Sequence, residues 1–153
     1  MATLTPTLTL SSTDIFADQP LSLSVTDSLT VEAPMTDISR MNTDDNIGNG
    51  AGVIIADLIQ DTYFVYVKHT GILASDGTSA ANATADYITL SNADGEAGSN
   101  IIRLYPGEFA FFPLEPSDGS DGGTEPGGLK VTAGSAAVQI NYAYWKRSKQ
   151  LNK

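Results

Sequence analysis

Cysteine is absent from the 153 residues of this chain, and histidine occurs once, at His69. The lack of cysteine excludes disulfides, zinc–thiolate sites and thiol nucleophiles. A Ser-His-Asp arrangement would depend on His69 alone, and no G-x-S-x-G segment offers it a nucleophile elbow. We therefore expect no catalytic residues, no enzyme activity and no transition-metal site. We expect His69 to be a strand-end side chain that caps backbone groups or faces solvent.

Long apolar runs and an excess of positive charge are also missing. No segment approaches the roughly 18 consecutive apolar residues of a membrane-spanning helix, so we expect no membrane association. Acids outnumber bases by 18 to 8, for a formal net charge of −10. A negative surface repels phosphate groups, which argues against nucleic acid as a partner. No glycine-rich phosphate loop opens a helix, which argues against a nucleotide cofactor.

Two acidic segments deserve a test as calcium loops, namely residues 44–46 and the group Asp118, Asp121 and Glu125. Calcium takes roughly six to eight oxygen ligands that converge on the ion. Neither segment has the D-x-D-x-D-G spacing of a helical calcium loop, and both read as solvated turns. We therefore expect no metal ion, and no other cofactor.

Alternation of apolar and polar residues with period two dominates the first third of the chain. Residues 4–10 place leucines on one face and threonines on the other, and Pro6 cannot donate to a strand ladder. This pattern favours an edge strand, or an arm that lies on a neighbour. Residues 21–33 place their apolar side chains on odd positions, with an interruption at 26–28 that indicates a bulge or a turn between two strands.

Shorter strands separated by Gly and Asn clusters fill the rest. Residues 63–67 form an aromatic and β-branched run typical of a central strand. Turn signals at residues 92–95 and 106–107 each join two predicted strands. The cleanest alternation follows residue 137 and places Val138, Ile140, Tyr142 and Tyr144 on a core face, with Trp145 pointing the other way.

Eight to ten strands at this spacing predict an all-β fold. We expect an antiparallel β-sandwich with jelly-roll-like connectivity. We divide the chain into an N-terminal extended arm or edge strand (1–20), a β-sandwich domain (21–145) and a basic C-terminal tail (146–153). The tail holds four of the eight bases and no acid, so residues 1–145 carry a formal charge of −14. A basic tail on an acidic, hydroxyl-rich body suggests docking onto other protein.

Three segments near the C-terminal end share a pattern with a known class of proteins. They are LYPGEFAFFPL (104–114), GLKVTA (128–133) and VQINYAYW (138–145). Over roughly residues 100–145 the chain resembles small β-sandwich virion structural proteins of tailed bacteriophages, notably cyanobacterial myophages. Before residue 100 the similarity is one of composition. The resemblance implies a structural role in the particle and brings no catalytic residues with it.

The resemblance implies a virion protein, assembled in the cytoplasm of the host bacterium. We expect a capsid decoration or cement protein that binds the outer surface of the shell and stabilises it. The alternatives are a neck-, tail- or fibre-associated adaptor, and a carbohydrate-binding module for host attachment. The expected partners are the major capsid protein or other virion proteins, and further copies in a homo-oligomer, with a trimer favoured. The candidate interface residues are Leu4, Leu8, Leu10, Trp145, Lys146, Arg147 and Lys149.

Overall fold

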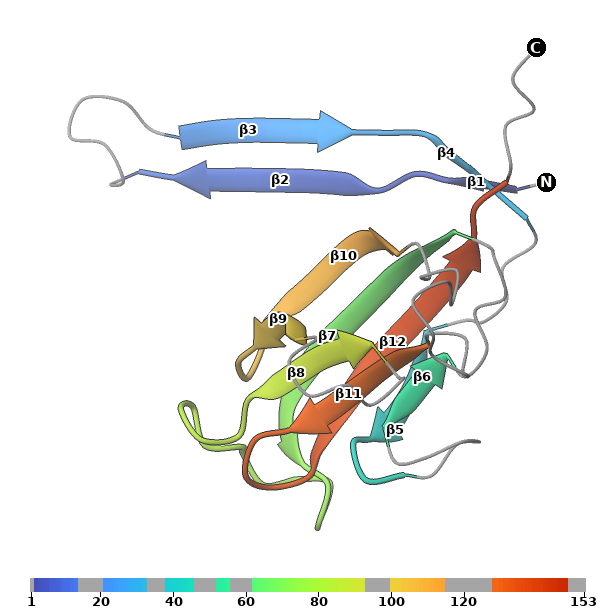
Figure 1. Cartoon of the computed structure of the whole chain (residues 1–153). Coiled ribbons are helices and arrows are strands. Elements are labelled where there is room, and N and C mark those ends of the chain that lie inside the picture. The colour runs from blue at the N-terminus through green and yellow to red at the C-terminus, as the bar shows by residue number, and fades with distance from the viewer. Residues whose placement is uncertain are drawn as a thin grey trace.

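A computed structural model describes residues 2–13, 21–32, 38–45, 52–55, 62–92, 100–114 and 128–148. Within these ranges the chain forms twelve β-strands and no helix, so the all-β prediction is confirmed (Figure 1). The strands are β1 (Ala2–Leu4), β2 (Thr7–Ser12), β3 (Leu21–Thr26), β4 (Leu29–Val31), β5 (Ser39–Asn42), β6 (Val53–Ile55), β7 (Tyr63–Leu73), β8 (Ile88–Asn92), β9 (Asn100–Leu104), β10 (Phe109–Leu114), β11 (Leu129–Ala133) and β12 (Val138–Lys146). The same residues include no helix long and apolar enough to cross a membrane.

Strands β5 to β12 form two four-stranded antiparallel sheets, in the orders β10-β7-β12-β5 and β6-β11-β8-β9. Strand β5 pairs with β12, β6 with β11, β7 with β10, and β8 with β9. The four pairs are nested like one long folded hairpin, with β8 and β9 as the innermost pair and β5 and β12 as the outermost pair. Alternate pairs of the hairpin enter opposite sheets, which is the jelly-roll arrangement. The predicted antiparallel β-sandwich with jelly-roll connectivity is confirmed.

The hydrophobic core lies between these two sheets. Its buried residues are Met41, Ile54, Tyr63, Val65, Val67, Ile88, Leu90, Leu104, Leu129, Val131, Val138 and Ile140. Strand β7 is a central strand, as its aromatic and β-branched sequence predicted. Tyr142 and Tyr144 of β12 are half-buried and pack against the core. The predicted inward register of β12 is therefore confirmed.

One predicted turn is also confirmed. Strands β8 and β9 pair as an antiparallel hairpin, and the turn signal between them, at residues 92–95, lies outside the described residues after Asn92. Between β9 and β10, the Glu108 N–H donates to the Tyr105 carbonyl at 2.9 Å, and Gly107 has a φ of +88°. A positive φ at the third residue is the requirement of a type II turn, which glycine meets without steric cost. This turn carries the chain from one sheet to the other.

His69 differs from the expectation, because its side chain is fully buried inside β7 and does not face solvent. Strand β7 runs on to Leu73, and the pairing of His69 with Ile140 turns the ring toward the core. Its Nδ1 accepts from the Gly71 N–H at 3.0 Å, so the ring proton lies on Nε2, which donates to the Asp86 carbonyl at 2.6 Å. The expectation of a solvent-facing strand end is wrong, whereas the alternative, a side chain that caps backbone groups, agrees with these two hydrogen bonds.

Strands β1 to β4 lie outside both sandwich sheets and form a long two-stranded hairpin, which we call the arm. Leu4 pairs with Leu29 and Thr7 with Thr26, so β1-β4 and β2-β3 share one register. The ladder breaks at Pro6, which has no N–H to donate. One hydrogen bond of the ladder remains at this position, from the Asp27 N–H to the Pro6 carbonyl at 3.1 Å.

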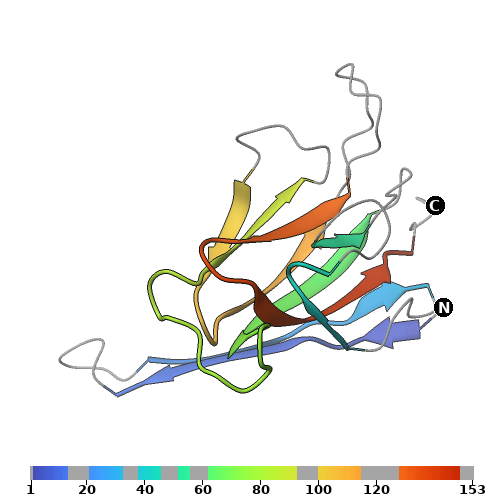
Figure 2. The ribbon, with the colours of Figure 1, turned by 90° about the horizontal axis from the view of Figure 1, so that it is seen from below.

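The extent of the arm differs from the division suggested by the sequence. Residues 21–31 pair with residues 2–12, and they join neither four-stranded sheet. The arm therefore reaches Val31, beyond the suggested boundary at residue 20, and the sandwich strands begin at Ser39. Figures 1 and 2 both show β2 and β3 extending away from the common base of the arm, with their far end beyond the sandwich.

Candidate protein-interaction surface

The tip of the arm, β2 and β3, carries an uncovered apolar face. Leu8 pairs with Val25 and Leu10 with Leu23, and residues directly opposite in a ladder share a face. Their exposed fractions are 47% for Leu8, 51% for Val25 and 42% for both Leu10 and Leu23. Four large apolar side chains thus lie together on one face of a hairpin that no other described element covers.

The opposite face of the arm tip is lined by hydroxyl groups. The Oγ1 atoms of Thr7 and Thr26 lie 3.1 Å apart, and Thr9 Oγ1 lies 3.5 Å from Ser24 Oγ. Strands β2 and β3 contain no charged residue at all. Proteins commonly protect exposed strand edges with lysine or other charges. Strands β2 and β3 lack this protection, so their free edges are open to pairing with another strand.

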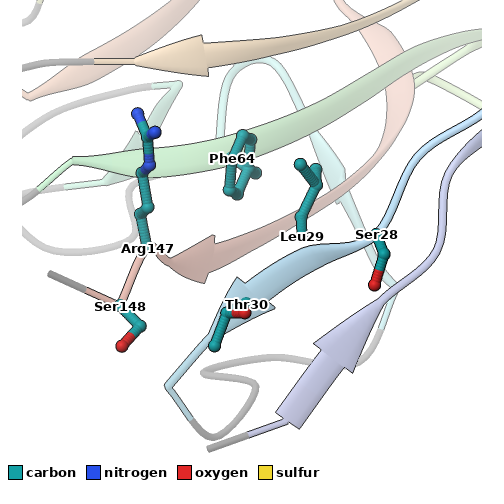
Figure 3. A pocket seen from close by; sticks show the side chains of 6 residues that line it. All are labelled: Ser28, Leu29, Thr30, Phe64, Arg147 and Ser148. Atoms are coloured by element: carbon teal, nitrogen blue, oxygen red, sulfur yellow. The ribbon is translucent and has the colours of Figure 1, made fainter. Parts of the chain in front are cut away.

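At its base the same apolar face is covered. The register continues the stripe to Leu4 and Leu29, which are half-buried, and to Val31, which is 2% exposed. Leu29 and Phe64 line a small hollow together with Ser28, Thr30, Arg147 and Ser148. Figure 3 shows Leu29 pointing from β4 toward Phe64 of β7. The apolar stripe is therefore buried near the sandwich and bare away from it.

Backbone hydrogen bonds fix the base of the arm to the end of β12. The Glu32 N–H donates to the Lys146 carbonyl at 2.9 Å, and the Ser148 N–H donates to the Thr30 carbonyl at 3.1 Å. Val31 and Arg147 form an isolated antiparallel bridge between these two bonds. Residues 30–32 and 146–148 thus make a short ladder, which we call the seam.

The two basic side chains of the seam interact with their own chain. Lys146 Nζ lies 3.3 Å from Glu32 Oε2, and the Arg147 guanidinium lies 5.9 Å from the centre of the Phe64 ring. Both residues were candidates for contact with a partner. Their main contacts in the structure join the arm to the sandwich. Lys149, the third basic candidate, lies outside the described residues.

The outer face of the β10-β7-β12 part of the sheet is rich in aromatic rings, and we call it the aromatic face. Phe64 and Phe111 stack with centroids 6.1 Å apart, and Tyr66 and Phe109 lie 6.3 Å apart. Phe109 is 58% exposed and Phe111 is 37% exposed. Trp145 pairs with Phe64 and is half-buried. The face is covered at its Phe64 end by the base of the arm and is open around Phe109.

The ionisable groups of the described residues indicate structural roles. Burial raises the pKa of Tyr144, and the neighbouring Tyr142 adds to this effect. Asp45 accepts hydrogen bonds from the Asn42 backbone N–H at 2.7 Å and from its side chain, which makes it a turn residue. No group of three His, Asp or Glu residues that could hold a metal occurs among the described residues. The other calcium candidate, residues 118–125, lies outside them.

Sequence reasoning found part of this surface. It placed Leu4, Leu8 and Leu10 on one face, and the structure brings this face together with Leu23 and Val25, which were not among the candidates. The odd-position register of residues 21–31 was the available signal, but the partner strand was unknown. Phe109 and Phe111 were also missed, although alternation within FAFFPL offered a signal.

No protein-family model matches the sequence. Comparison with curated proteins and with solved structures likewise finds no match.

Proposed function

We propose that this chain is a non-enzymatic structural protein of a tailed-phage virion, which decorates the outer surface of the capsid and stabilises it. The observation that carries the proposal is the bare apolar face of the arm tip, with exposed fractions of 42–51% at Leu8, Leu10, Leu23 and Val25. Either a shell subunit or a neighbouring copy attached to the same shell would cover this face. The resemblance of residues 100–145 to virion structural proteins is the reason for proposing a phage virion as the place where the chain acts. A jelly roll alone does not favour one function, because this fold serves many.

The energetics suit attachment in many copies. Covering four half-exposed apolar side chains contributes about 1 kcal/mol for each side chain. Such a contact is weak for a single site, because association costs several kcal/mol in lost motion. Repetition over a shell, or linkage of several arms in one oligomer, converts weak contacts into firm attachment. We propose the major capsid protein or another virion protein as the partner, and a homo-oligomer, with a trimer favoured, as the attaching unit.

Binding to bare capsids tests the proposal. Purified protein is mixed with shells assembled without it, the shells are pelleted, and the bound copies are counted. We expect saturable binding that Leu10→Asp weakens strongly, because the charge enters the apolar face. Thr9→Asp is the matched control, since it adds the same charge to the hydroxyl face one residue away. Absence of saturable binding to any shell would refute the decoration role.

The copy number per particle separates decoration from its alternatives. Attachment in the hundreds supports decoration, whereas a few copies per particle support a neck-, tail- or fibre-associated adaptor. A carbohydrate-binding role predicts signal on a glycan array that disappears with Trp145→Ala. Trp145 is half-buried beside Phe64, so folding of that variant must be verified by circular dichroism.

A further inference from the structure

We infer that the apolar face of the arm tip packs on the aromatic face of a second copy of this chain. Both surfaces are apolar, both are uncovered, and both occur on the same molecule. Leu10 and Val25 represent the first, at 42% and 51% exposed, and Phe109 represents the second, at 58% exposed. A chain that carries two complementary surfaces forms closed rings or reciprocal dimers when the geometry brings them together.

The base of the arm already shows which surface the apolar stripe fits. Leu29 of the stripe and Phe64 of the aromatic face line the same hollow (Figure 3). Leu8, Leu10, Leu23 and Val25 continue the stripe, and Tyr66, Phe109 and Phe111 continue the aromatic face. The proposed interface therefore repeats between copies a contact that the fold makes within one copy. The lengths match as well, because six-residue strands such as β2 and β10 each span about 20 Å.

The seam explains why the arm serves another copy and leaves its own aromatic face open. Two backbone hydrogen bonds, the Val31–Arg147 bridge and the Lys146–Glu32 ion pair hold the base of the arm. With the base fixed, β2 and β3 run along one side of the sandwich, and their far end lies beyond it in both views (Figures 1 and 2). Phe109 and Leu10 consequently both stay exposed within one chain. The arm tip has no charged residue, so docking removes no charge of the arm from water.

The molar mass of the purified chain in solution, with no other protein present, is the first test. We expect an oligomer, and we expect Leu10→Asp to weaken self-association by about 30-fold or more, because it removes an apolar contact and buries a charge. Phe109→Ser should act likewise from the other side of the interface. The controls are Thr9→Asp on the hydroxyl face and Ile101→Ser, which changes a side chain 49% exposed on β9 of the other sheet. A monomeric wild type, or equal effects of Leu10→Asp and Thr9→Asp, would overturn the inference.

Engineered cysteines give a second test on a clean background, since the chain has none of its own. Leu10→Cys and Phe111→Cys are made as separate proteins, mixed and oxidised, and linked peptides are identified by mass spectrometry. We expect a disulfide that joins the two positions, which in this mixture can form only between chains. Thr9→Cys mixed with Phe111→Cys is the control and should link much less. A third protein carries both Leu10→Cys and Phe111→Cys. If a disulfide forms only within single chains of this double variant, the arm closes on its own sheet.

These tests need no capsid, so the inference does not rest on the proposed virion function. Self-association without capsid binding would retain this interface and remove the decoration role, whereas capsid binding by a monomer would do the reverse.

Discussion

The β7–β12 pair and the β2–β3 pair share the same alternation of side chains, but they differ in whether the apolar face is buried. Both are antiparallel ladders whose side chains alternate between two faces. In β7–β12 the inward residues, such as Val67 and Ile140, are fully buried beneath the second sheet. In β2–β3 the equivalent residues, such as Leu10 and Leu23, remain 42% exposed. Alternation therefore creates an apolar face, and only a second layer covers it.

The comparison also distinguishes a self-sufficient unit from a dependent one. An isolated two-stranded hairpin is marginally stable in water, because it has no second layer on which to bury its apolar face. The arm is held by its base, where Val31 is 2% exposed and the seam supplies backbone bonds. Its tip has no such support among the described residues. A surface of this kind is stable once a partner covers it, which is the reason for assigning it to interaction.

The largest expected effect comes from making the same substitution in the two regions. Leu90→Ala removes a side chain that is fully buried between the sheets and should lower the free energy of unfolding by about 2–5 kcal/mol. Leu10→Ala at the arm tip should change it by about 0.5 kcal/mol or less. Urea unfolding at protein concentrations too low for self-association measures both. Similar losses for the two variants would mean that the arm tip packs against its own sandwich.

A substitution at the buried His69 measures how much a polar core residue of β7 contributes to the free energy of unfolding. His69→Ala removes the ring that bonds the Asp86 carbonyl and the Gly71 N–H, and leaves both groups without that partner inside the protein. We expect a loss of about 2–3 kcal/mol in unfolding free energy. Lys68→Ala, at the preceding position on the outer face, is the control and should cost much less. Equal stability of the His69→Ala variant and the wild type in urea would contradict the buried role.

The smallest effect concerns the joint between the two regions. Deleting residues 147–153 removes the Val31–Arg147 bridge and the Ser148–Thr30 hydrogen bond. We expect faster hydrogen exchange at the backbone amides of β1 and β4, with a change in global unfolding free energy below about 1 kcal/mol. Deleting only 149–153 retains the seam and should leave this exchange unchanged. Equal exchange rates in the two truncations would show that residues 147 and 148 do not hold the arm.

Much of the fold could be predicted because the sequence is locally consistent. The alternation in β12 fixed Ile140 as a core residue, and Gly107 marked a turn that needs a positive φ. The pairing of residues 21–31 could not be read in the same way, because alternation does not name the partner strand. The burial of His69 was missed for a similar reason, since the extension of β7 to Leu73 depends on its pairing with β12.

The candidate interaction surface was likewise predictable only in part. Residues 4–10 were recognised as an apolar face, because that property belongs to one strand. The roles of Lys146 and Arg147 within the seam were not, because Glu32 and Phe64, which their side chains meet, are more than 80 residues away in the chain. The sequence shows that the tail is basic, whereas the fold decides which acidic or aromatic side chain contacts each basic side chain.

The sequence by itself determined the class of this protein: an all-β chain of alternating strands, with an acidic body, without cysteine, and with a leucine-bearing first strand that has no charge to protect it. Tertiary structure alone decided which apolar faces are closed and which are open. Periodicity is a local property that assigns each side chain to a face. Burial depends on contacts between segments distant in the chain, and those contacts cover Ile140 and leave Leu10 and Phe109 exposed.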